Sequence, residues 1–492
     1  MKSLGSTIVL HLRKHAGVGV VCAVAYFDPG NWGVDLQAGS QFGYRLLFVV
    51  LVAGLFGAFL QALLEPGLAS HCRLLLYDRP KHPLLYRRLV LYPLYVLSEV
   101  AIISTDLAEL LGSAIALNLL FPNLKIWHGV LITAFDVVVL LALRDPLRST
   151  PVKMFEILIA GLVLAVLVCM VMIVAKVDVG WAKAFQGFLP SKFIFADNAL
   201  YISVGIIGAT VMPHSLFLGS ALATQDRLRA QQVVSPASLK SREVAAKPGS
   251  NFAKLQSLVN HCTSIFRPPP PSSTCTTVTR HEDRENNPLA FIRAHLNHGI
   301  FDVVGTASVF FYGSGSPKDE NAASLYDAYN LIHDAVGPPA ATFFAIALLA
   351  AGQSSSIIAT VAGQAVSEGF LNWRVSPVVR RLLTRLIAVI PALIVAVAAG
   401  RSGIDALLII SQVVLSIVLP FITLPLIYLT SSKTIMRARK TVTEDNPESS
   451  NDASAVDYSN NLLTTLVGLA IWLVMVAANG YVIVTLIIDA RR

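Results

Sequence analysis

The stretch Ala25-Tyr26-Phe27-Asp28-Pro29-Gly30-Asn31 interrupts the first long apolar segment of this 492-residue chain. Proline removes a backbone donor and clashes with the preceding turn, and glycine allows the chain to leave helical geometry. A membrane helix broken in this way frees carbonyl groups, which are tolerated only against protein or a wet cavity. Asp28 and Asn31 then offer oxygen ligands at the break. The simpler alternative is an ordinary helix start, with Asp28 as N-cap and Pro29 at the first helical position.

A later apolar segment carries a similar interruption, Gly205-Ile206-Ile207-Gly208-Ala209-Thr210-Val211-Met212-Pro213-His214-Ser215. It too combines a proline and glycines with side chains that can bind a metal. Two interrupted segments in corresponding positions of two halves are the best sequence indication of a transporter's binding site. The pair of breaks therefore predicts a secondary transporter whose site lies between two broken helices.

The composition is that of a polytopic membrane protein. Hydrophobic residues make up 54% of the chain and charged residues 14%, whereas a soluble domain carries about 25% charged residues. The net charge of +8 is therefore interpreted as an asymmetry of the loops, not as a nucleic-acid signature. The cysteines show no CxxC spacing and are expected to be unpaired. No nucleophile–base pair or nucleotide loop indicates an enzyme.

Eleven membrane spans are expected, because the apolar residues fall in blocks of about 20 residues, the length that crosses a bilayer. Lys and Arg gather in the N-terminal residues 1–15 and after spans two, four, eight and ten, which predicts a cytoplasmic N-terminus and an outside C-terminus. The basic residues counted after span eight are Arg374, Arg380 and Arg381. The spans are expected at 16–38, 46–64, 89–118, 127–143, 155–176, 199–222, 297–313, 339–362, 382–399, 404–429 and 462–487.

Two polar stretches are expected to be disordered in the cytoplasm. Residues 228–290 are basic, rich in serine and threonine, and contain the run Pro268-Pro269-Pro270-Pro271, and residues 441–460 are acidic. Neither stretch can bury enough apolar surface to fold alone. The proline run is interpreted as a plain linker, with a docking segment for trafficking partners as the alternative.

Span three carries three carboxylates, Glu99, Asp106 and Glu109. Their offsets of seven and three residues place them on one helical face, which we name the acidic stripe. Ionisable groups inside a membrane are costly and are functional hypotheses by default. The stripe is expected to relay protons or to pair with buried cations, for which Arg385 in span nine is the candidate. Structural ion pairing is the alternative, and a structural role is preferred for the lone acids Asp136, Glu156 and Asp302.

The two breaks together supply a mixed set of metal donors. Asp28 and Asn31 provide oxygen, and Met212 adds a thioether. Further oxygens are expected from the freed carbonyls near Ala25 and Ala209. Hard Ca²⁺ and Mg²⁺ prefer oxygen-only shells, whereas a soft sulfur ligand favours transition metals, so Mn²⁺ or Fe²⁺ is the expected substrate. His214 is expected to be a ligand or a proton carrier, and simple packing is the alternative for Met212.

At these residues the chain resembles the natural resistance-associated macrophage protein (Nramp) family. Asp28-Pro29-Gly30-Asn31 and Met212-Pro213-His214 are similar to the two signature breaks of that family. Residues 98–109 resemble its third helix, residues 353–370 its transport loop after helix eight, and residues 411–421 its tenth helix. The motif Met-Pro-His-Ser-Leu-Phe-Leu-Gly and the long basic loop are similar to those of the fungal manganese and iron branch of the family.

The resemblance implies a proton-coupled transporter of divalent transition metals (Mn²⁺, Fe²⁺, and also Cd²⁺ and Co²⁺) with the all-α, leucine-transporter-like inverted-repeat fold. Residues 16–176 and 199–429 would form the two five-helix repeats, followed by a cytoplasmic loop at 430–461 and an eleventh helix at 462–487. No cofactor is implied. The implied partners are the metal, H⁺ and the lipid of a plasma, endosomal or vacuolar membrane, with no nucleic acid.

The resemblance also implies roles for individual residues. The metal ligands would be Asp28, Asn31, Met212 and Gln412, with the carbonyls of Ala25 and Ala209 joining in different states. The proton pathway would use Glu99, Asp106, Glu109, His214 and Arg385. The chain departs from the family in two places, since Gly219 stands where many members have a second histidine and span seven is short and contains Asp302.

Two other functions are weighed against transport. A metal-sensing receptor built on a transporter scaffold would keep the same fold, but the surviving ligand set and acidic stripe favour transport. A channel would need a continuous pore with several sites, and two breaks that converge on one site argue against it.

Overall fold

The computed structural model describes residues 28–63, 67–77, 81–140, 180–196, 198–223, 324–373, 376–438, 456–489 and 491, and single positions between 161 and 172. The predictions for Ala25, Glu156, Asp302, span seven, most of span five and the loop at 228–290 lie outside these residues. Within the described ranges the chain is helical, apart from one antiparallel ladder between β1 (Arg437–Ala438) and β2 (Val456–Asp457).

The long helices overlap the expected spans wherever the structure describes them. They are α3 (Pro29–Phe42), α4 (Leu47–Ala62), α7 (Tyr92–Leu120), α8 (Ile126–Leu140), α11 (Ala199–Thr210), α12 (Pro213–Ala223), α17 (Pro338–Leu371), α18 (Pro377–Ala398), α19 (Gly400–Ser431) and α20 (Leu462–Asp489). The largest difference is at α17, which continues to Leu371, nine residues beyond the expected end at 362. The shorter helices are η2 (Gly43–Leu46), α5 (Leu68–Leu76), α6 (Pro83–Tyr86), η3 (Arg87–Leu91), α10 (Trp181–Gly187), η4 (Lys192–Phe195) and α16 (Leu325–Val336).

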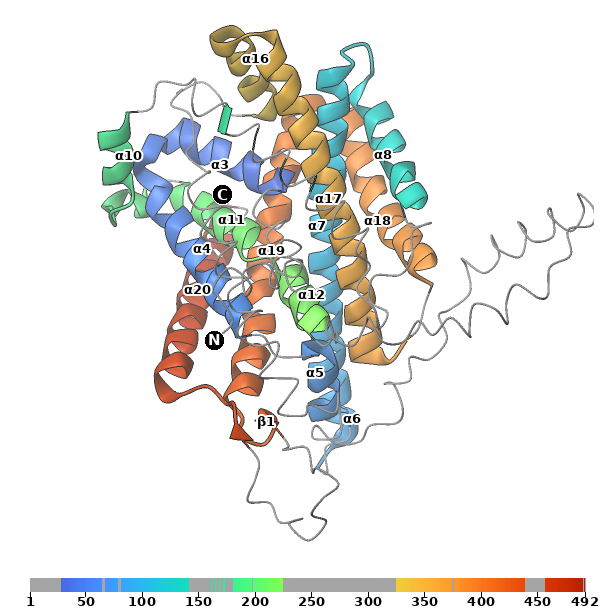
Figure 1. The fold of residues 1–492 in the computed structure, drawn as a ribbon, viewed down its shortest axis with the longest axis vertical. Coiled ribbons are helices and arrows are strands. Elements are labelled where there is room, and N and C mark those ends of the chain that lie inside the picture. Colours follow the sequence, from blue (N-terminus) through green and yellow to red (C-terminus); the bar gives the residue numbers. More distant parts are fainter. Residues whose placement is uncertain are drawn as a thin grey trace, which may run out of the picture.

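Six segments of the described chain are long and apolar enough to cross a membrane. One of them, Pro29–Ala62, comprises α3 and α4, which run in different directions in Figure 1. The chain turns between them at Gly43, whose positive φ of 56° favours glycine. This turn agrees with the prediction of separate first and second spans, although α3 ends at Phe42 and not at 38.

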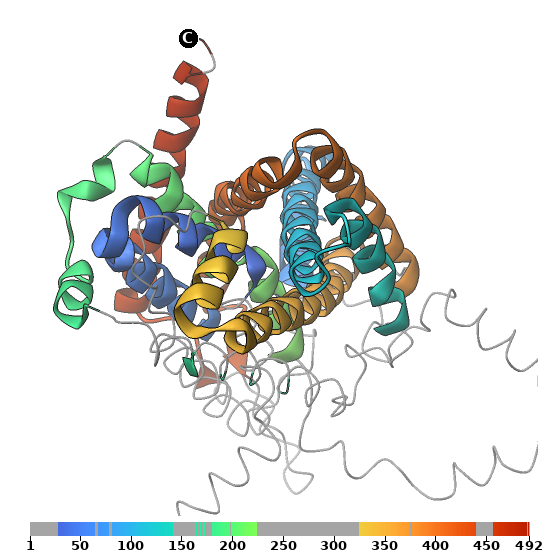
Figure 2. The ribbon, with the colours of Figure 1, turned by 90° about the horizontal axis from the view of Figure 1, so that it is seen from above.

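The central helix of the bundle is α7. It packs against α8, α17, α18 and α19, and Figure 2 shows these helices around it. Its buried side chains extend from Leu94 to Leu119. Asp106 and Glu109 of the acidic stripe are therefore in the interior of the protein, and Glu99 is partly buried, so each charge needs a partner.

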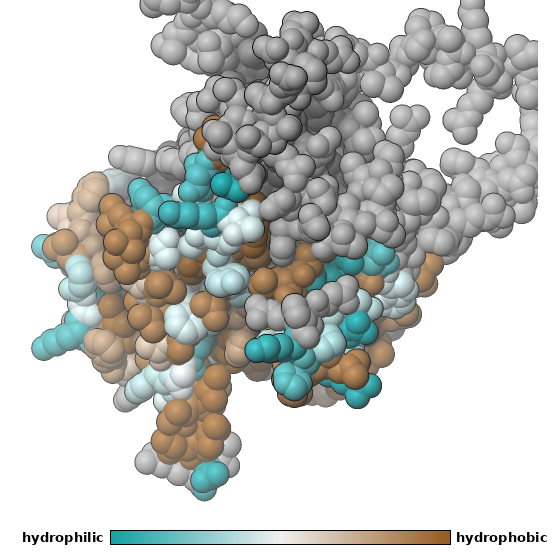
Figure 3. Space-filling model, turned by 90° about the horizontal axis from the view of Figure 1, so that it is seen from below, coloured by the Kyte–Doolittle hydropathy of each residue, from teal (hydrophilic) through white to brown (hydrophobic). Residues whose placement is uncertain are grey.

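The outer helices expose apolar side chains, as expected for helices that face lipid. On α18 the exposed residues include Leu383, Ile387, Ile390 and Ile394, and on α20 they include Leu463, Leu466 and Leu473. Hydrophobic residues are prominent on the described surface seen from below in Figure 3. A soluble monomer rarely exposes so much contiguous apolar surface.

Two sequence-based expectations are corrected by the fold. Residues 353–370 are not a loop, since they continue α17 to Leu371. This half of the helix is rich in small and hydroxyl side chains. The hydroxyls donate hydrogen bonds to backbone carbonyls of the preceding turn, as Thr360 Oγ1 does to the Ser356 carbonyl at 2.9 Å. Arg380 is not a loop cation, because α18 begins at Pro377 and Arg380 is buried in its first turns.

The end of the predicted disordered stretch 441–460 is also ordered. Val456 and Asp457 pair with Arg437 and Ala438, and Asn460 N–H donates to the Thr430 carbonyl at 2.9 Å. The backbone of this segment is thus bonded mainly to residues 436–438, which follow α19, and at Asn460 to the last turn of α19.

Candidate metal-binding site

The first break is a helix start buried inside the protein. Asp28 is the N-cap of α3, and its Oδ2 and Oδ1 accept the backbone N–H groups of Gly30 and Asn31, both at 3.0 Å. Pro29 occupies the first helical position, where its missing N–H costs nothing. Asp28 is fully buried. The capped start agrees with the alternative of an ordinary helix start, and the helix expected before it lies outside the described residues.

The second break separates α11 from α12. Val211 leaves helical geometry with φ −97° and ψ 70°, and the chain resumes as a helix at Pro213. Because Pro213 has no N–H, the Ala209 carbonyl four residues earlier loses its intrahelical donor. Asn31 Nδ2 donates to that carbonyl at 3.2 Å. The two breaks predicted from the sequence are thereby joined by a direct hydrogen bond.

A third helix, α19, meets the first break through Gln412. A Cβ atom at Gly30 would lie 2.0 Å from Gln412 Nε2 and 2.8 Å from Asp28 Oδ2, so only glycine permits this approach. Gln412 is fully buried and donates from Nε2 to Ser411 Oγ at 3.1 Å. Its Oε1 has no hydrogen-bond partner among the described residues. A buried orphan acceptor beside a buried carboxylate is the kind of group that a cation would satisfy.

The remaining ligand of the predicted set, Met212, is fully buried between α11 and α12. Within the described residues no three His, Cys, Asp or Glu side chains gather as a metal cluster. The chemistry at the breaks is therefore one carboxylate with amide and carbonyl oxygens and a neighbouring thioether. Such a set provides weak neutral ligands around a single negative charge, and its sulfur suits softer divalent ions.

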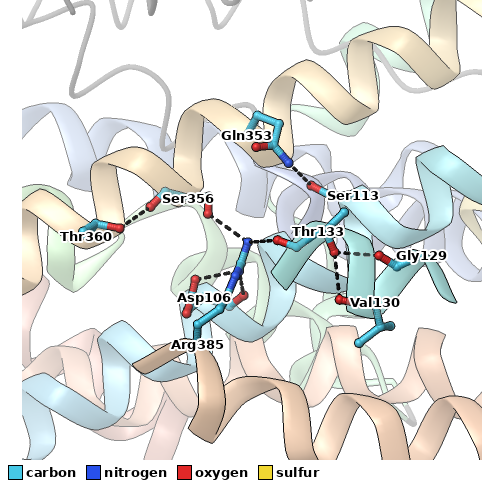
Figure 4. A network of polar contacts seen from close by, with 9 residues as sticks. All are labelled: Asp106, Ser113, Gly129, Val130, Thr133, Gln353, Ser356, Thr360 and Arg385. Atoms are coloured by element: carbon cyan, nitrogen blue, oxygen red, sulfur yellow. Dashed lines mark hydrogen bonds and ion pairs between the residues drawn. The ribbon is translucent and has the colours of Figure 1, made fainter. Parts of the chain in front are cut away.

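The acidic stripe pairs with arginines of α18. Arg385 Nη1 lies 2.8 Å from Asp106 Oδ1, and both side chains are buried. Arg385 Nη2 also donates to the Thr133 carbonyl at 3.0 Å and to Ser356 Oγ at 3.1 Å, which ties together four helices (Figure 4). The expectation that Arg385 is the partner of the stripe agrees with this geometry.

A second ion pair was missed by sequence reasoning. Arg380 Nη2 donates to both carboxylate oxygens of Glu99, at 2.6 and 2.7 Å. Gly363 of α17 makes room for this arginine, since a Cβ there would lie 2.8 Å from its Nε. The dipeptide Ser376-Pro377 is a helix-start signal, and it would have placed Arg380 inside span nine.

His214 connects the second break to the central helix. Its Nδ1 lies 3.2 Å from Thr105 Oγ1, next to Asp106 in the sequence, and the imidazole is buried. Its Nε2 has no hydrogen-bond partner among the described residues. Glu109 is also fully buried on α7. The predicted proton-pathway residues thus lie on α7, α12 and α18, and His214 follows the break that carries Met212.

Comparison with known proteins gives a match over most of the chain. The profile described as natural resistance-associated macrophage protein-like (Nramp) matches residues 19–257 and 293–443. The chain is 38% identical over 484 residues to the manganese transporter pdt1 of Schizosaccharomyces pombe, covering 96% of this chain and 85% of that protein. It is 36% identical over 509 residues to the iron transporter SMF3 of Saccharomyces cerevisiae, covering 98% of each.

A solved structure with a similar fold is that of the manganese transporter of Eremococcus coleocola in complex with an aromatic bis-isothiourea substituted compound. It aligns with a TM-score of 0.62 at 25% identity and covers 97% of this chain and 87% of that one. The multi-span, all-helical architecture described above is therefore shared with a known transporter structure.

Proposed function

Because the chain belongs to the natural resistance-associated macrophage protein (Nramp) family, we propose that it carries divalent transition metals, Mn²⁺ and Fe²⁺ foremost, across a membrane together with protons. The chain is a multi-pass integral membrane protein. Two similar proteins are named as a manganese transporter and an iron transporter, which supports this class of substrate. No cofactor is required, since the metal is the cargo.

The observation that carries the proposal is the hydrogen bond between Asn31 and the Ala209 carbonyl, beside buried Asp28. This contact brings a carboxylate, an amide and a freed carbonyl to one place inside the bundle, with the Gln412 amide against Gly30. Rotation of the Asn31 side-chain amide would direct Oδ1 toward a cation bound beside the Ala209 carbonyl. Met212 would then select transition metals over Ca²⁺.

The proton would move along the acidic stripe on α7. Asp106 and Glu99 each face an arginine of α18, so uptake of a proton by either acid would free a buried positive charge. His214 would couple this route to the metal, because it follows Met212 by two residues and bonds to Thr105 of α7. Glu109 would serve as a further proton carrier one turn along α7.

The finer architecture is part of the proposal. Residues 16–176 and 199–429 would form two inverted repeats of five helices, and 430–461 would be a cytoplasmic loop before the eleventh helix. Each repeat would then open with a broken helix, and alternating access would come from rocking one bundle against the other. The loop at 228–290 would remain a linker.

The test is Mn²⁺ uptake and proton flux in proteoliposomes that contain the full chain. Asp28→Ala should abolish saturable uptake, because it removes the only charged ligand proposed, and Asp334→Ala, which changes an exposed acid of α16, should leave it intact. Normal uptake by correctly inserted Asp28→Ala protein would reject the proposal. Metal binding by calorimetry without flux in the parent protein would favour the metal-sensing receptor instead.

A further inference from the structure

The helix that carries Gln412, α19, is continuous but contains prolines, and one of them, Pro420, lies two turns after Gln412. Pro420 lies inside α19 and has no N–H to give to the carbonyl of Ser416, four residues earlier. A buried carbonyl without a donor is costly where no water can reach it. Ser416 is fully buried, so this carbonyl needs a donor from another part of the protein.

The donor comes from the last helix of the chain. Asn479 of α20 donates from Nδ2 to the Ser416 carbonyl at 3.0 Å and to the Met475 carbonyl of its own helix at 2.8 Å. Both partners are acceptors, which requires the nitrogen of the amide at this position. Asn479 is only 5% exposed, on a helix whose other side chains largely face outward.

The supported carbonyl belongs to the turn that presents Gln412. Gly208 of α11 packs closely against the same turn, because a Cβ there would lie 2.1 Å from the Gln412 carbonyl and 2.6 Å from Ser416 N. The turn from Gln412 to Ser416 is therefore held between α11 and α20. The arrangement repeats that of the second break, where Asn31 satisfies the carbonyl freed by Pro213.

We propose that Asn479 is a positioning residue for metal transport, through which the eleventh helix sets the bend of α19 and hence the place of Gln412. Without the amide, the Ser416 carbonyl regains a donor only if α19 changes its bend. Gln412 lies one turn away on the same rigid segment and would move with it. The inference rests on the proposed function, in which Gln412 binds the metal.

The first measurement is the KM for Mn²⁺ uptake, with the amount of inserted protein determined separately. Asn479→Ala should raise KM about threefold, the scale of one intramembrane hydrogen bond. The matched control is Trp472→Phe, which removes another hydrogen bond from α20 to α19, that from Trp472 Nε1 to the Pro420 carbonyl at 2.9 Å. That carbonyl keeps Leu424 N–H as its helical donor, so KM should not change.

The second measurement places Asn479→Ala in a Pro420→Ala background, where the restored N–H can serve the Ser416 carbonyl. The asparagine should then become dispensable, and the double variant should have the KM of Pro420→Ala alone. Equal effects of Asn479→Ala in both backgrounds, or a loss of inserted protein at unchanged KM, would overturn the inference.

Gln412→Ala, measured alongside, separates this inference from the proposed function. If Gln412→Ala raises KM and Asn479→Ala does not, only the role of Asn479 is rejected. If Gln412→Ala leaves KM unchanged, Gln412 is not a ligand and both proposals on this residue are rejected.

Discussion

Asn31 and Ala209 are separated by 178 residues in the sequence, yet the Asn31 amide nitrogen lies 3.2 Å from the Ala209 carbonyl oxygen. The Ala209 carbonyl lacks its helical donor because Pro213 has no N–H. Asn31 lies in the first turn of α3, which Asp28 caps, and its side-chain amide donates to that carbonyl. One bond thus offsets the cost of the break between α11 and α12 and joins α3 to α11.

The packing of the first break against α7 gives a steric prediction. A Cβ at Gly112 of α7 would lie 2.1 Å from Pro29 Cβ and 2.4 Å from Pro29 Cγ. Gly112→Ala should therefore displace Asp28 and lower Mn²⁺ uptake by about fivefold or more, the effect expected from overpacking of about 1–3 kcal/mol. Gly480→Ala is the control, because a Cβ at Gly480 meets no atom within 4 Å. Equal uptake by the two variants would contradict the packing.

Met212 is predicted to select the metal. Sulfur binds Mn²⁺, Fe²⁺ and Cd²⁺ well but Ca²⁺ and Mg²⁺ poorly, so Met212→Ala should weaken transition-metal uptake moderately and let Ca²⁺ compete. The loss should be largest for Cd²⁺, the softest of these ions. Uptake of Mn²⁺ and Cd²⁺ with and without excess Ca²⁺ measures this. If Ca²⁺ competes as poorly as in the parent protein, Met212 only packs.

Asp106 is predicted to affect proton coupling more than metal binding. Asp106→Asn leaves the Arg385 guanidinium buried without its anion, which should destabilise the protein by about 3–5 kcal/mol. Asp106→Asn with Arg385→Gln should recover part of that stability in thermal unfolding, but not the metal-driven proton flux. A separate proton pathway is rejected if Asp106→Asn lowers metal uptake and proton flux by the same factor at every pH.

The Glu99–Arg380 pair is predicted to hold α18 to α7. Arg380→Met leaves the Glu99 carboxylate partly buried without a cation, and the side chains are 8% and 17% exposed, so the cost should be about 2 kcal/mol after allowance for solvent. Arg380→Lys keeps the charge but loses the fork geometry, and should fall between. Thermal unfolding of Arg380→Met, Glu99→Gln and the double variant completes a double-mutant cycle, and additive effects of the two single changes would reject the pairing.

Much of the helical framework was predictable because its causes are local. The positions of α4, α11 with α12, α19 and α20 follow from apolar runs long enough to cross a bilayer, and the break between α11 and α12 follows from a proline that acts within one turn. The one-face placement of Glu99 and Asp106 follows from helical periodicity. The loop that the resemblance implied at 353–370 was wrong, because these residues continue α17 to Leu371 and their serine side chains are buried there. The apolar pattern had already placed residues 353–362 in the span expected at 339–362.

The sequence by itself determined that the chain is a membrane protein, that a helix is interrupted before Pro213, and that oxygen and sulfur donors lie at this break and at the start of α3. Only the tertiary structure decided which groups meet. Arg380 pairs with Glu99, 281 residues earlier in the sequence. Asn479 is a polar residue in an apolar helix, and only the fold shows that it donates to the Ser416 carbonyl. The physical reason is that a proline removes the donor of a carbonyl within its own helix, which local sequence shows. The replacement donor comes from another helix, and which residue supplies it depends on how distant helices pack.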